Sequence, residues 1–245
     1  MEVYFLGRAP YQATWDLQER LRTRVLQGGP EALLLCEHSP VLTLGRSATD
    51  ADILAGRDLL QAQGIEVHRS SRGGQVTYHG PGQLVVYPIV RLRKGVVAHV
   101  EWLAGAAIEL ASQYGLSARF DREQVGVWLG TRKLAAIGVH VSRRVTIHGM
   151  AISILRQATQ PFSQRWFVPC GNPHGRAISL EEALTPQAEA AETSADPATS
   201  PLLSALSVES AAERLVPVLL RRAQQDPRVA VHSSVALLSR SLSVE

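Results

Sequence analysis

The stretch Ser71-Arg72-Gly73-Gly74-Gln75-Val76-Thr77-Tyr78-His79-Gly80-Pro81-Gly82-Gln83 places four glycines and a proline among polar side chains, and the apolar run 84–90 follows it directly. Glycine accepts positive φ and lets the backbone approach a ligand closely. The apolar run is typical of a buried strand. The stretch therefore predicts a glycine-rich hairpin attached to a buried strand, which is a good position for a binding site. The same glycines would also serve the turns of a hairpin with no further function.

The composition is that of a globular enzyme. The chain has 245 residues, of which 45% are hydrophobic and 19% are charged, as expected for one large domain or a domain with an appendage. No apolar run approaches the roughly 20 residues of a membrane helix. The N-terminus lacks the basic and apolar regions of a signal peptide, so the cytoplasm is the expected compartment.

The charge pattern argues against nucleic-acid binding. The net charge is +3, and only Lys94 and Lys133 of the 25 basic residues are lysines. The arginines are scattered, without the aromatic residues that accompany them in nucleic-acid sites. Genome composition explains the preference for arginine as well as function does, but the basic balance permits an acidic partner.

The apolar patterns predict an α+β fold with a largely antiparallel sheet, because strands and helices are mixed without regular βαβ alternation. Strands are expected at 3–6, 32–36, 41–44, 65–68 and, as consecutive antiparallel strands, at 125–129, 134–141 and 145–155. Helices are expected from Pro10 to Gly28, at 58–63, at 98–114 and at 209–224, the last interrupted at Pro217. Ser179 and Glu182 form a capping box. Residues 185–200 read as a linker and the last residues as a frayed tail.

Two further stretches contain residues that could carry chemistry. Lys133 opens a strand, although a lone lysine there is more often a surface residue. Cys170 stands between Pro169 and Gly171 in a turn, which suits a nucleophile. Cys36 lies in an apolar run and is expected in the core. The different settings of the two cysteines argue against a disulfide.

Taken together, four motifs resemble the octanoyltransferases, also called lipoyl(octanoyl) transferases. The motifs are 72–83, 133–139, 148–151 and 169–171, in the order and spacing of that family, and the resemblance covers residues 3–184. It implies the α+β fold of biotin and lipoate ligases, a mixed, mainly antiparallel sheet flanked by helices. It also implies a catalytic domain at 1–184, followed by a linker and helical extension at 185–245. Ser153, Asn172 and Ile178 depart from the family pattern.

The resemblance implies transfer of an octanoyl group from octanoyl-acyl carrier protein to a lysine of a lipoyl domain. The expected acceptors are the lipoyl domains of 2-oxoacid dehydrogenase complexes and the glycine cleavage H protein. Cys170 would carry the acyl group as a thioester, and Lys133 would lower the thiol pKa and move protons. No cofactor is expected. The histidines lack metal-ligand spacing, so no metal is expected either. The implied substrate-binding residues are Arg72, Gly73, Gly74, Gln75, Val76, Thr77, Tyr78, His79, Ala136, Ile137, Gly138, Gly149, Met150 and Ala151.

Several alternatives stay open at this point. An ATP-dependent lipoate–protein ligase would need the lysine but not Cys170, and a lipoyl amidotransferase would use both residues. A non-catalytic lipoyl-domain adaptor would need neither. His79 and His148 are expected to be structural hydrogen-bonding groups more than proton carriers. Arginines at the pocket mouth, with Arg46, Arg72, Arg143 and Arg144 as candidates, are expected to steer an acidic carrier protein.

Overall fold

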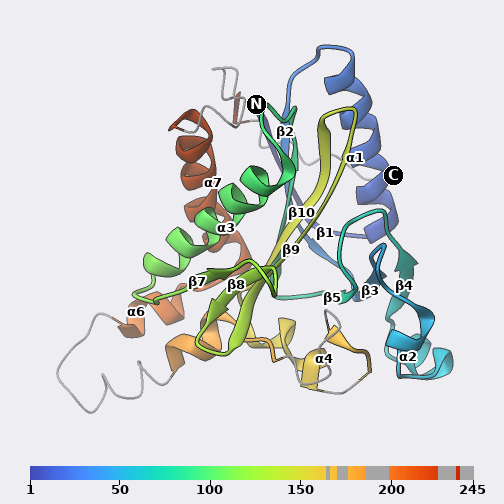
Figure 1. Ribbon diagram of the computed structural model, residues 1–245. Coiled ribbons are helices and arrows are strands. Elements are labelled where there is room, and N and C mark those ends of the chain that lie inside the picture. Colours follow the sequence, from blue (N-terminus) through green and yellow to red (C-terminus); the bar gives the residue numbers. More distant parts are fainter. Residues whose placement is uncertain (164–165, 170–175, 186–198, 226–235, 238–245) are drawn as a thin grey trace.

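Two β-sheets form the frame of the protein in this computed structural model (Figure 1), which describes residues 1–163, 166–169, 176–185, 199–225 and 236–237. The large sheet has the order β11-β1-β2-β6-β10-β9-β8-β7, and the small sheet has the order β4-β3-β5. The strands are β1 (Glu2–Ala9), β2 (Ala32–His38), β3 (Val41–Leu44), β4 (Glu66–Arg69), β5 (Val76–His79), β6 (Gln83–Ile89), β7 (Arg119–Asp121), β8 (Gly126–Leu129), β9 (Arg132–Ser142), β10 (Val145–Ser153) and β11 (Ala236–Leu237).

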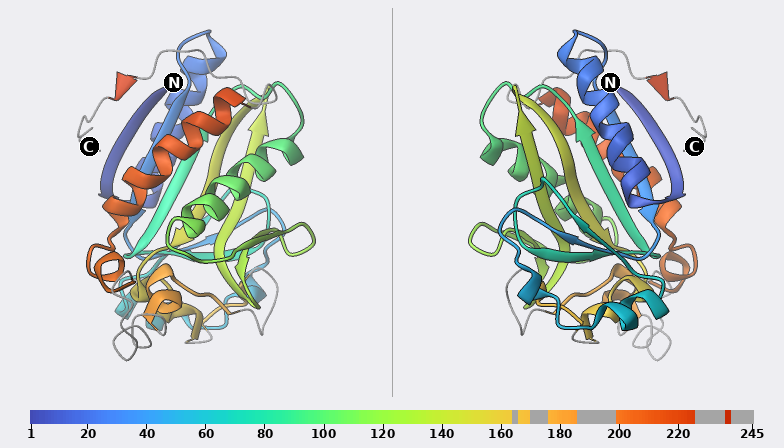
Figure 2. Two further views of the ribbon diagram at one scale, coloured as in Figure 1. Left: turned by 90° about the vertical axis from the view of Figure 1, so that its left-hand side faces the viewer. Right: turned by 90° about the vertical axis from the view of Figure 1, so that its right-hand side faces the viewer.

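Helices cover both faces of the large sheet (Figure 2). The helices are α1 (Tyr11–Leu26), α2 (Arg57–Ala62), α3 (Val96–Ser112), α4 (Gln160–Ser163), α6 (Thr199–Ser204) and α7 (Val208–Gln225), with 3-10 turns at η1 (Asp50–Asp52) and η2 (Arg156–Ala158). Helices α3 and α7 pack on one face and α1 on the other. Alternate residues of each strand point to opposite faces, so each strand contributes to both cores. Leu33, Val86 and Ile152 thus join the α3–α7 core, whereas Leu34 and Val85 pack under α1.

The predicted fold class is confirmed. In the large sheet β1 pairs in parallel with β2 and β11, and the other strand pairs are antiparallel. The predicted capping box is also present, since Ser179 and Glu182 exchange hydrogen bonds at the start of the helical residues 180–185. Cys36 is buried, as expected. No helix in the described ranges is both long enough and apolar enough to cross a bilayer.

The glycine-rich stretch does not form the predicted hairpin. Strand β5 pairs with β3 in the small sheet, whereas β6 pairs with β2 and β10 in the large one. The turn at Gly80–Gly82 carries the chain between the sheets. Gly82 has a φ of 82°, its N–H donates to Glu37 Oε2 at 2.8 Å, and its carbonyl accepts from Ile154 and Leu155. The stretch therefore joins the two sheets at the place where they meet.

Two expectations at the C-terminal end are wrong. Helix α7 continues through Pro217 instead of breaking there. Pro217 is on the exposed side, while Leu215, Val218 and Leu219 are buried in the core shared with α3, and this packing offsets the missing N–H. The frayed tail also needs correction at Ala236–Leu237, which pairs with β1. The predicted linker falls mostly on residues 186–198, outside the described ranges.

Candidate active site

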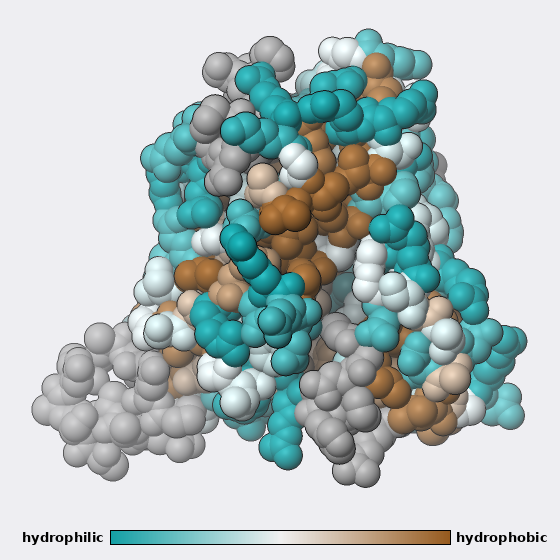
Figure 3. Space-filling model, in the orientation of Figure 1, coloured by the Kyte–Doolittle hydropathy of each residue, from teal (hydrophilic) through white to brown (hydrophobic). Residues whose placement is uncertain are grey.

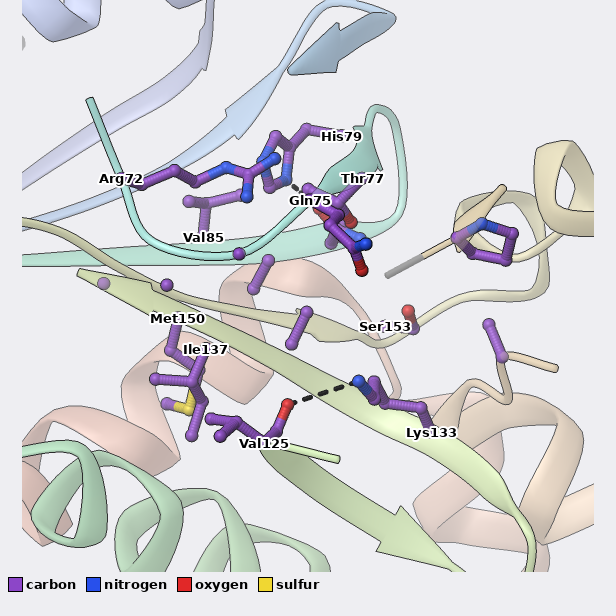
Figure 4. A pocket seen from close by; sticks show the side chains of 18 of the residues that line it. Arg72, Gln75, Thr77, His79, Val85, Val125, Lys133, Ile137, Met150 and Ser153 are labelled. Atoms are coloured by element: carbon purple, nitrogen blue, oxygen red, sulfur yellow. Dashed lines mark hydrogen bonds between the residues drawn. The ribbon is translucent and has the colours of Figure 1, made fainter. Parts of the chain in front are cut away.

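A cavity of about 460 Å³ lies where the two sheets meet (Figure 4). Residues of β5 and of the loop before it face the cavity from the small-sheet side, and residues of β6, β8, β9 and β10 form the opposite wall. The lining residues that the argument uses are Tyr11, Arg72, Gly73, Gly74, Gln75, Thr77, His79, Tyr87, Val125, Trp128, Lys133, Ala136, Ile137, Gly138, His148, Gly149, Met150, Ala151, Ser153, Pro169, Arg176 and Ala177. One space thus brings together residues of all four sequence motifs.

The predicted substrate-binding residues line this cavity except for Val76 and Tyr78. Successive side chains of a strand point to opposite faces, so Thr77 and His79 face the cavity. Val76 and Tyr78 instead pack with Leu42 in the core of the small sheet. The sequence motif identifies the strand but does not say which alternate residues face the ligand.

Lys133 lies at the start of β9, on the cavity wall. Its ammonium donates to the Val125 carbonyl at 3.2 Å and lies 4.9 Å from the centre of the Trp128 ring. Its backbone is paired with the segment 176–178, since Lys133 N donates to Arg176 O at 2.8 Å and Ile178 N donates to Lys133 O at 3.0 Å. Pro169 and Arg176 both line the cavity. Cys170 and Asn172 lie outside the described residues.

Arg72 anchors the glycine loop from inside the protein. Its Nη2 donates to Thr43 O at 2.6 Å and its Nε to Thr43 Oγ1 at 3.1 Å. Gly73 N donates to Val139 O at 3.0 Å, and a Cβ on Gly138 would lie 3.0 Å from Gly73 O. The loop therefore lies directly on β9, and a side chain at position 138 would crowd it.

Of the predicted steering arginines, Arg72 lines the cavity, whereas Arg46, Arg143 and Arg144 are not among its lining residues. Arg72 is only 8% exposed, so it cannot attract a partner at the surface. Arg143 and Arg144 form the β9–β10 turn, at the opposite end of β9 from Lys133, and Arg144 is bonded to the carbonyls of Leu92 and Arg93. This turn lies in the hydrophilic upper part of the surface, whereas apolar residues gather lower down, between α3 and the β9–β10 hairpin (Figure 3).

His148 holds the glycine loop and α1 together. It has a φ of 59° within β10, an unusual conformation for a residue with a side chain. Its N–H donates to Gln18 Oε1 at 2.7 Å, and its Nε2 lies 3.0 Å from Ser71 Oγ. Burial, with the Arg72 cation as a second cause, lowers the pKa of His148 to about 3. The neutral, bonded ring favours the structural role expected for it.

His79 is likewise buried, with Nδ1 2.7 Å from Gln83 Oε1, and burial lowers its pKa to about 3. Behind it lie two tyrosines that the sequence did not single out. The Tyr11 hydroxyl lies 2.9 Å from Ser70 Oγ, and the Tyr87 hydroxyl lies 2.8 Å from His38 Nε2. Tyr11 and Tyr87 read as ordinary helix and strand residues in the sequence, which gave no signal of their place at the cavity.

The departures from the family pattern have different places. Ser153 lines the cavity and is 4% exposed. Ile178 is buried in the α3–α7 core. No group of three or more His, Cys, Asp or Glu side chains within the described ranges could hold a metal ion.

Buried histidines should make the protein sensitive to mild acid. Burial lowers the pKa values of His38 and His99 to about 4, and those of His79 and His148 to about 3, whereas an unfolded histidine titrates near pH 6.5. Between these values the unfolded state binds more protons, so stability is complete above pH 6.5 and falls as the pH drops. Each histidine is expected to remove up to about 1.4 kcal/mol per pH unit from the free energy of unfolding.

Urea unfolding at pH 7, 6 and 5 checks this prediction above the range where most carboxylates titrate. His99→Leu is the informative variant, because His99 stacks on Trp102 away from the cavity and neither of its ring nitrogens has a hydrogen-bond partner among the described residues. The free energy of unfolding of this variant should fall less steeply with decreasing pH than that of the wild type. An equally steep fall for the two proteins would contradict the contribution of buried His99 to the acid sensitivity.

Comparison with known proteins places the chain in a family. Residues 10–195 match the model of the lipoyl protein ligase A/B catalytic domain. An octanoyltransferase of Solibacter usitatus is 45% identical over 170 residues, which are 68% of this chain and 76% of that protein. The mitochondrial octanoyltransferase LIP2 of Arabidopsis thaliana is 38% identical over 200 residues, 77% of this chain and 83% of that protein.

Solved structures show the same fold at low sequence identity. LipL1 of P. falciparum in complex with lipoate aligns with a TM-score of 0.67 at 12% identity, covering 98% of this chain and 67% of that one. Lipoate-protein ligase A bound with ATP aligns with a TM-score of 0.63 at 13% identity, covering 97% and 90%. On the evidence of the family model and of these relatives, the chain belongs to the lipoyl protein ligase A/B catalytic domain family and, within it, to the octanoyltransferases.

Proposed function

We propose that this acyltransferase moves an octanoyl group from octanoyl-acyl carrier protein to a lysine of a lipoyl domain, through a thioester on Cys170. The observation that carries the proposal is the cavity itself. It is lined by Lys133 and by residues on both sides of the segment that contains Cys170, namely Pro169 and Arg176. The wall beyond them includes the apolar side chains of Ala136 and Ile137 on β9 and of Met150 and Ala151 on β10. An acyl chain can therefore lie along β9 and β10 with its reactive end beside Lys133.

The reaction then has two steps. Lys133 as a free amine takes the proton of the Cys170 thiol, and the thiolate attacks the donor thioester. The C–S bond to the carrier breaks, and the carrier thiol leaves with a proton. In the second step the acceptor amine attacks the enzyme thioester, giving the amide and restoring the thiol. The first step exchanges one thioester for another and the second forms a more stable amide, so ATP is not required.

The glycine loop would position the acyl group. Gly73 cannot stabilise the developing oxyanion through its N–H, because that group already donates to Val139 O. Its role in the proposal is instead to shape the wall opposite Gly138. An oxyanion donor must come from another group of the cavity.

The acceptors proposed are the lipoyl domains of 2-oxoacid dehydrogenase complexes and the glycine cleavage H protein, with the cytoplasm as the compartment. The fold alone does not separate this activity from ATP-dependent ligation, since lipoate-protein ligase A bound with ATP has the same fold. The higher sequence identity to octanoyltransferases favours transfer. An amidotransferase would use the same residues but would take its acyl group from another lipoylated protein.

A transfer assay separates these activities. Octanoyl-acyl carrier protein and a lipoyl domain are mixed with the enzyme in the absence of ATP, and the acylated lipoyl domain is detected by mass spectrometry. Parallel reactions supply octanoate with ATP, or an octanoylated H protein as donor. We expect acylation from the carrier protein at the highest rate. Acylation seen only with octanoate and ATP would show a ligase, and a preference for the H-protein donor would show an amidotransferase.

A further inference from the structure

The surroundings of Lys133 are formed by one β-hairpin. Strands β8 and β9 flank its turn, and the loop before β8 supplies the Val125 carbonyl, the acceptor of the Lys133 ammonium. The Trp128 ring lies on another side of the ammonium, 4.9 Å from it. The indole N–H of Trp128 donates to Gln124 O at 3.2 Å, which fixes the ring relative to the same loop. Lys133 thus contacts the Val125 carbonyl and the Trp128 ring, and the hydrogen bond from Trp128 to Gln124 joins the ring to the loop that contains Val125.

A register shift in the hairpin directs Lys133 to this position. Val127 pairs with Ala135, but the next residue, Trp128, pairs with Lys133 instead of Leu134. Paired side chains of antiparallel strands lie on the same face. Val127 and Ala135 point into the α3–α7 core, so Trp128 and Lys133 point to the other face. In a regular ladder Leu134 would face Trp128, and Lys133 would be directed toward the core. Bulges of this kind often re-aim a side chain next to an active site.

Gly126 leaves room for the lysine side chain. A Cβ at this position would lie 3.0 Å from Lys133 Cε and 2.7 Å from Ala135 O, and the φ of 156° also disfavours a larger residue. The stem of Lys133 therefore passes directly over Gly126 toward the Val125 carbonyl. The bulge, the glycine, the carbonyl and the indole ring all restrict the same side chain.

We propose that Trp128 is a positioning residue for Lys133, which it holds over the β8–β9 bulge so that the amine faces the reacting thioester. The inference rests on the proposed function, because it assigns Trp128 a role through the lysine of that reaction. Trp128 is 6% exposed and lines the cavity, so the alternative is that it only fills space. The two roles make different predictions for variants that keep or remove the aromatic face.

Trp128→Phe keeps an aromatic face, whereas Trp128→Leu and Trp128→Met remove it and stay apolar. The rate of octanoyl-enzyme formation is measured in single turnovers at increasing octanoyl-acyl carrier protein. The Leu and Met variants should lower the maximal rate about 3- to 30-fold, the range of a cation–π contact with the ammonium that forms when Lys133 takes the thiol proton, with little change in the half-saturating donor concentration. The Phe variant should recover most of the rate. Thermal melting identifies any variant that fails to fold, and the other non-aromatic variant then decides.

A double-mutant cycle separates positioning from space-filling. If Trp128 acts through Lys133, Trp128→Leu will have no further effect on the residual rate of Lys133→Met. An equal loss in both backgrounds would overturn the inference, as would a Leu variant with the wild-type rate. A wild-type enzyme that forms no octanoyl adduct at all would overturn the proposed function itself, and that result is visible before any Trp128 variant is compared.

Discussion

Lys133→Met is expected to lower kcat/KM for octanoyl transfer by about 10²–10⁴-fold, the usual contribution of a positioned general acid or base. The methionine side chain has a similar length and can occupy the space over Trp128, but it carries neither a charge nor a proton. Because the Lys133 side chain is near the surface of the hairpin and is not part of the core, the loss should appear in the rate and not in the stability. A transfer assay and a thermal melt of the same preparation check both parts.

Lys133→Arg is the matched control. It keeps the positive charge but does not deprotonate, and its planar group differs from an ammonium. If charge alone activates the thiol, the Arg variant will retain most of the activity. The proposed mechanism requires proton transfer, so we expect the Arg variant to be nearly as slow as the Met variant. Full activity of Lys133→Met would contradict the proposed mechanism.

Gly149→Ala should be the most destabilising Gly→Ala substitution in the cavity wall. A Cβ on Gly149 would lie 2.2 Å from Val86 O and 2.8 Å from Pro88 Cδ, so β10 and β6 must separate to admit it. Both strands are central in the large sheet, and such overpacking costs about 3 kcal/mol or somewhat more. Urea unfolding measures the loss.

Gly95→Ala is the control for the chemical change itself. Gly95 has a φ of −63° and nothing within 4 Å of the added methyl group. Gly95 is also the N-cap of α3, where alanine is less favourable than glycine, and the smaller freedom of the unfolded chain offsets part of this loss, so we expect a cost of less than about 1 kcal/mol. Equal stability of the two variants would show that β10 can move away from β6 without cost.

Local sequence patterns were sufficient for most elements. The spacing of Leu17, Leu21 and Val25 predicted α1, and these residues are buried against the sheet. The turns at 130–131 and 142–144 correctly predicted three consecutive antiparallel strands. In each case the signal and the structure it specifies lie within a few residues of each other.

Long-range pairing could not be predicted in this way. The glycine stretch looked like a local hairpin, but β5 finds its partner in β3, more than thirty residues earlier in the chain. The burial of Arg72 depends on Thr43 from that same strand. A pattern within 71–83 contains no information about either contact. The steering role expected for Arg72 is wrong because its side chain is buried.

The site shows the same division. The motifs identified the segments that line the cavity, yet they could not separate Thr77 and His79 from Val76 and Tyr78. The sequence does place Trp128 near Lys133, because Trp128 stands just before the predicted turn that leads to Lys133. A regular hairpin would not have paired the two residues, however, and the bulge that pairs them has no marker in the sequence.

The most direct test of the proposed reaction is an intact-mass spectrum of the enzyme mixed with octanoyl-acyl carrier protein, without ATP and without an acceptor. The account predicts one octanoyl group on the wild-type enzyme, located on Cys170 by peptide mapping, absent from Cys170→Ala and discharged when a lipoyl domain is added. An octanoyl group that persists on Cys170→Ala, or transfer that proceeds normally in that variant, would contradict it.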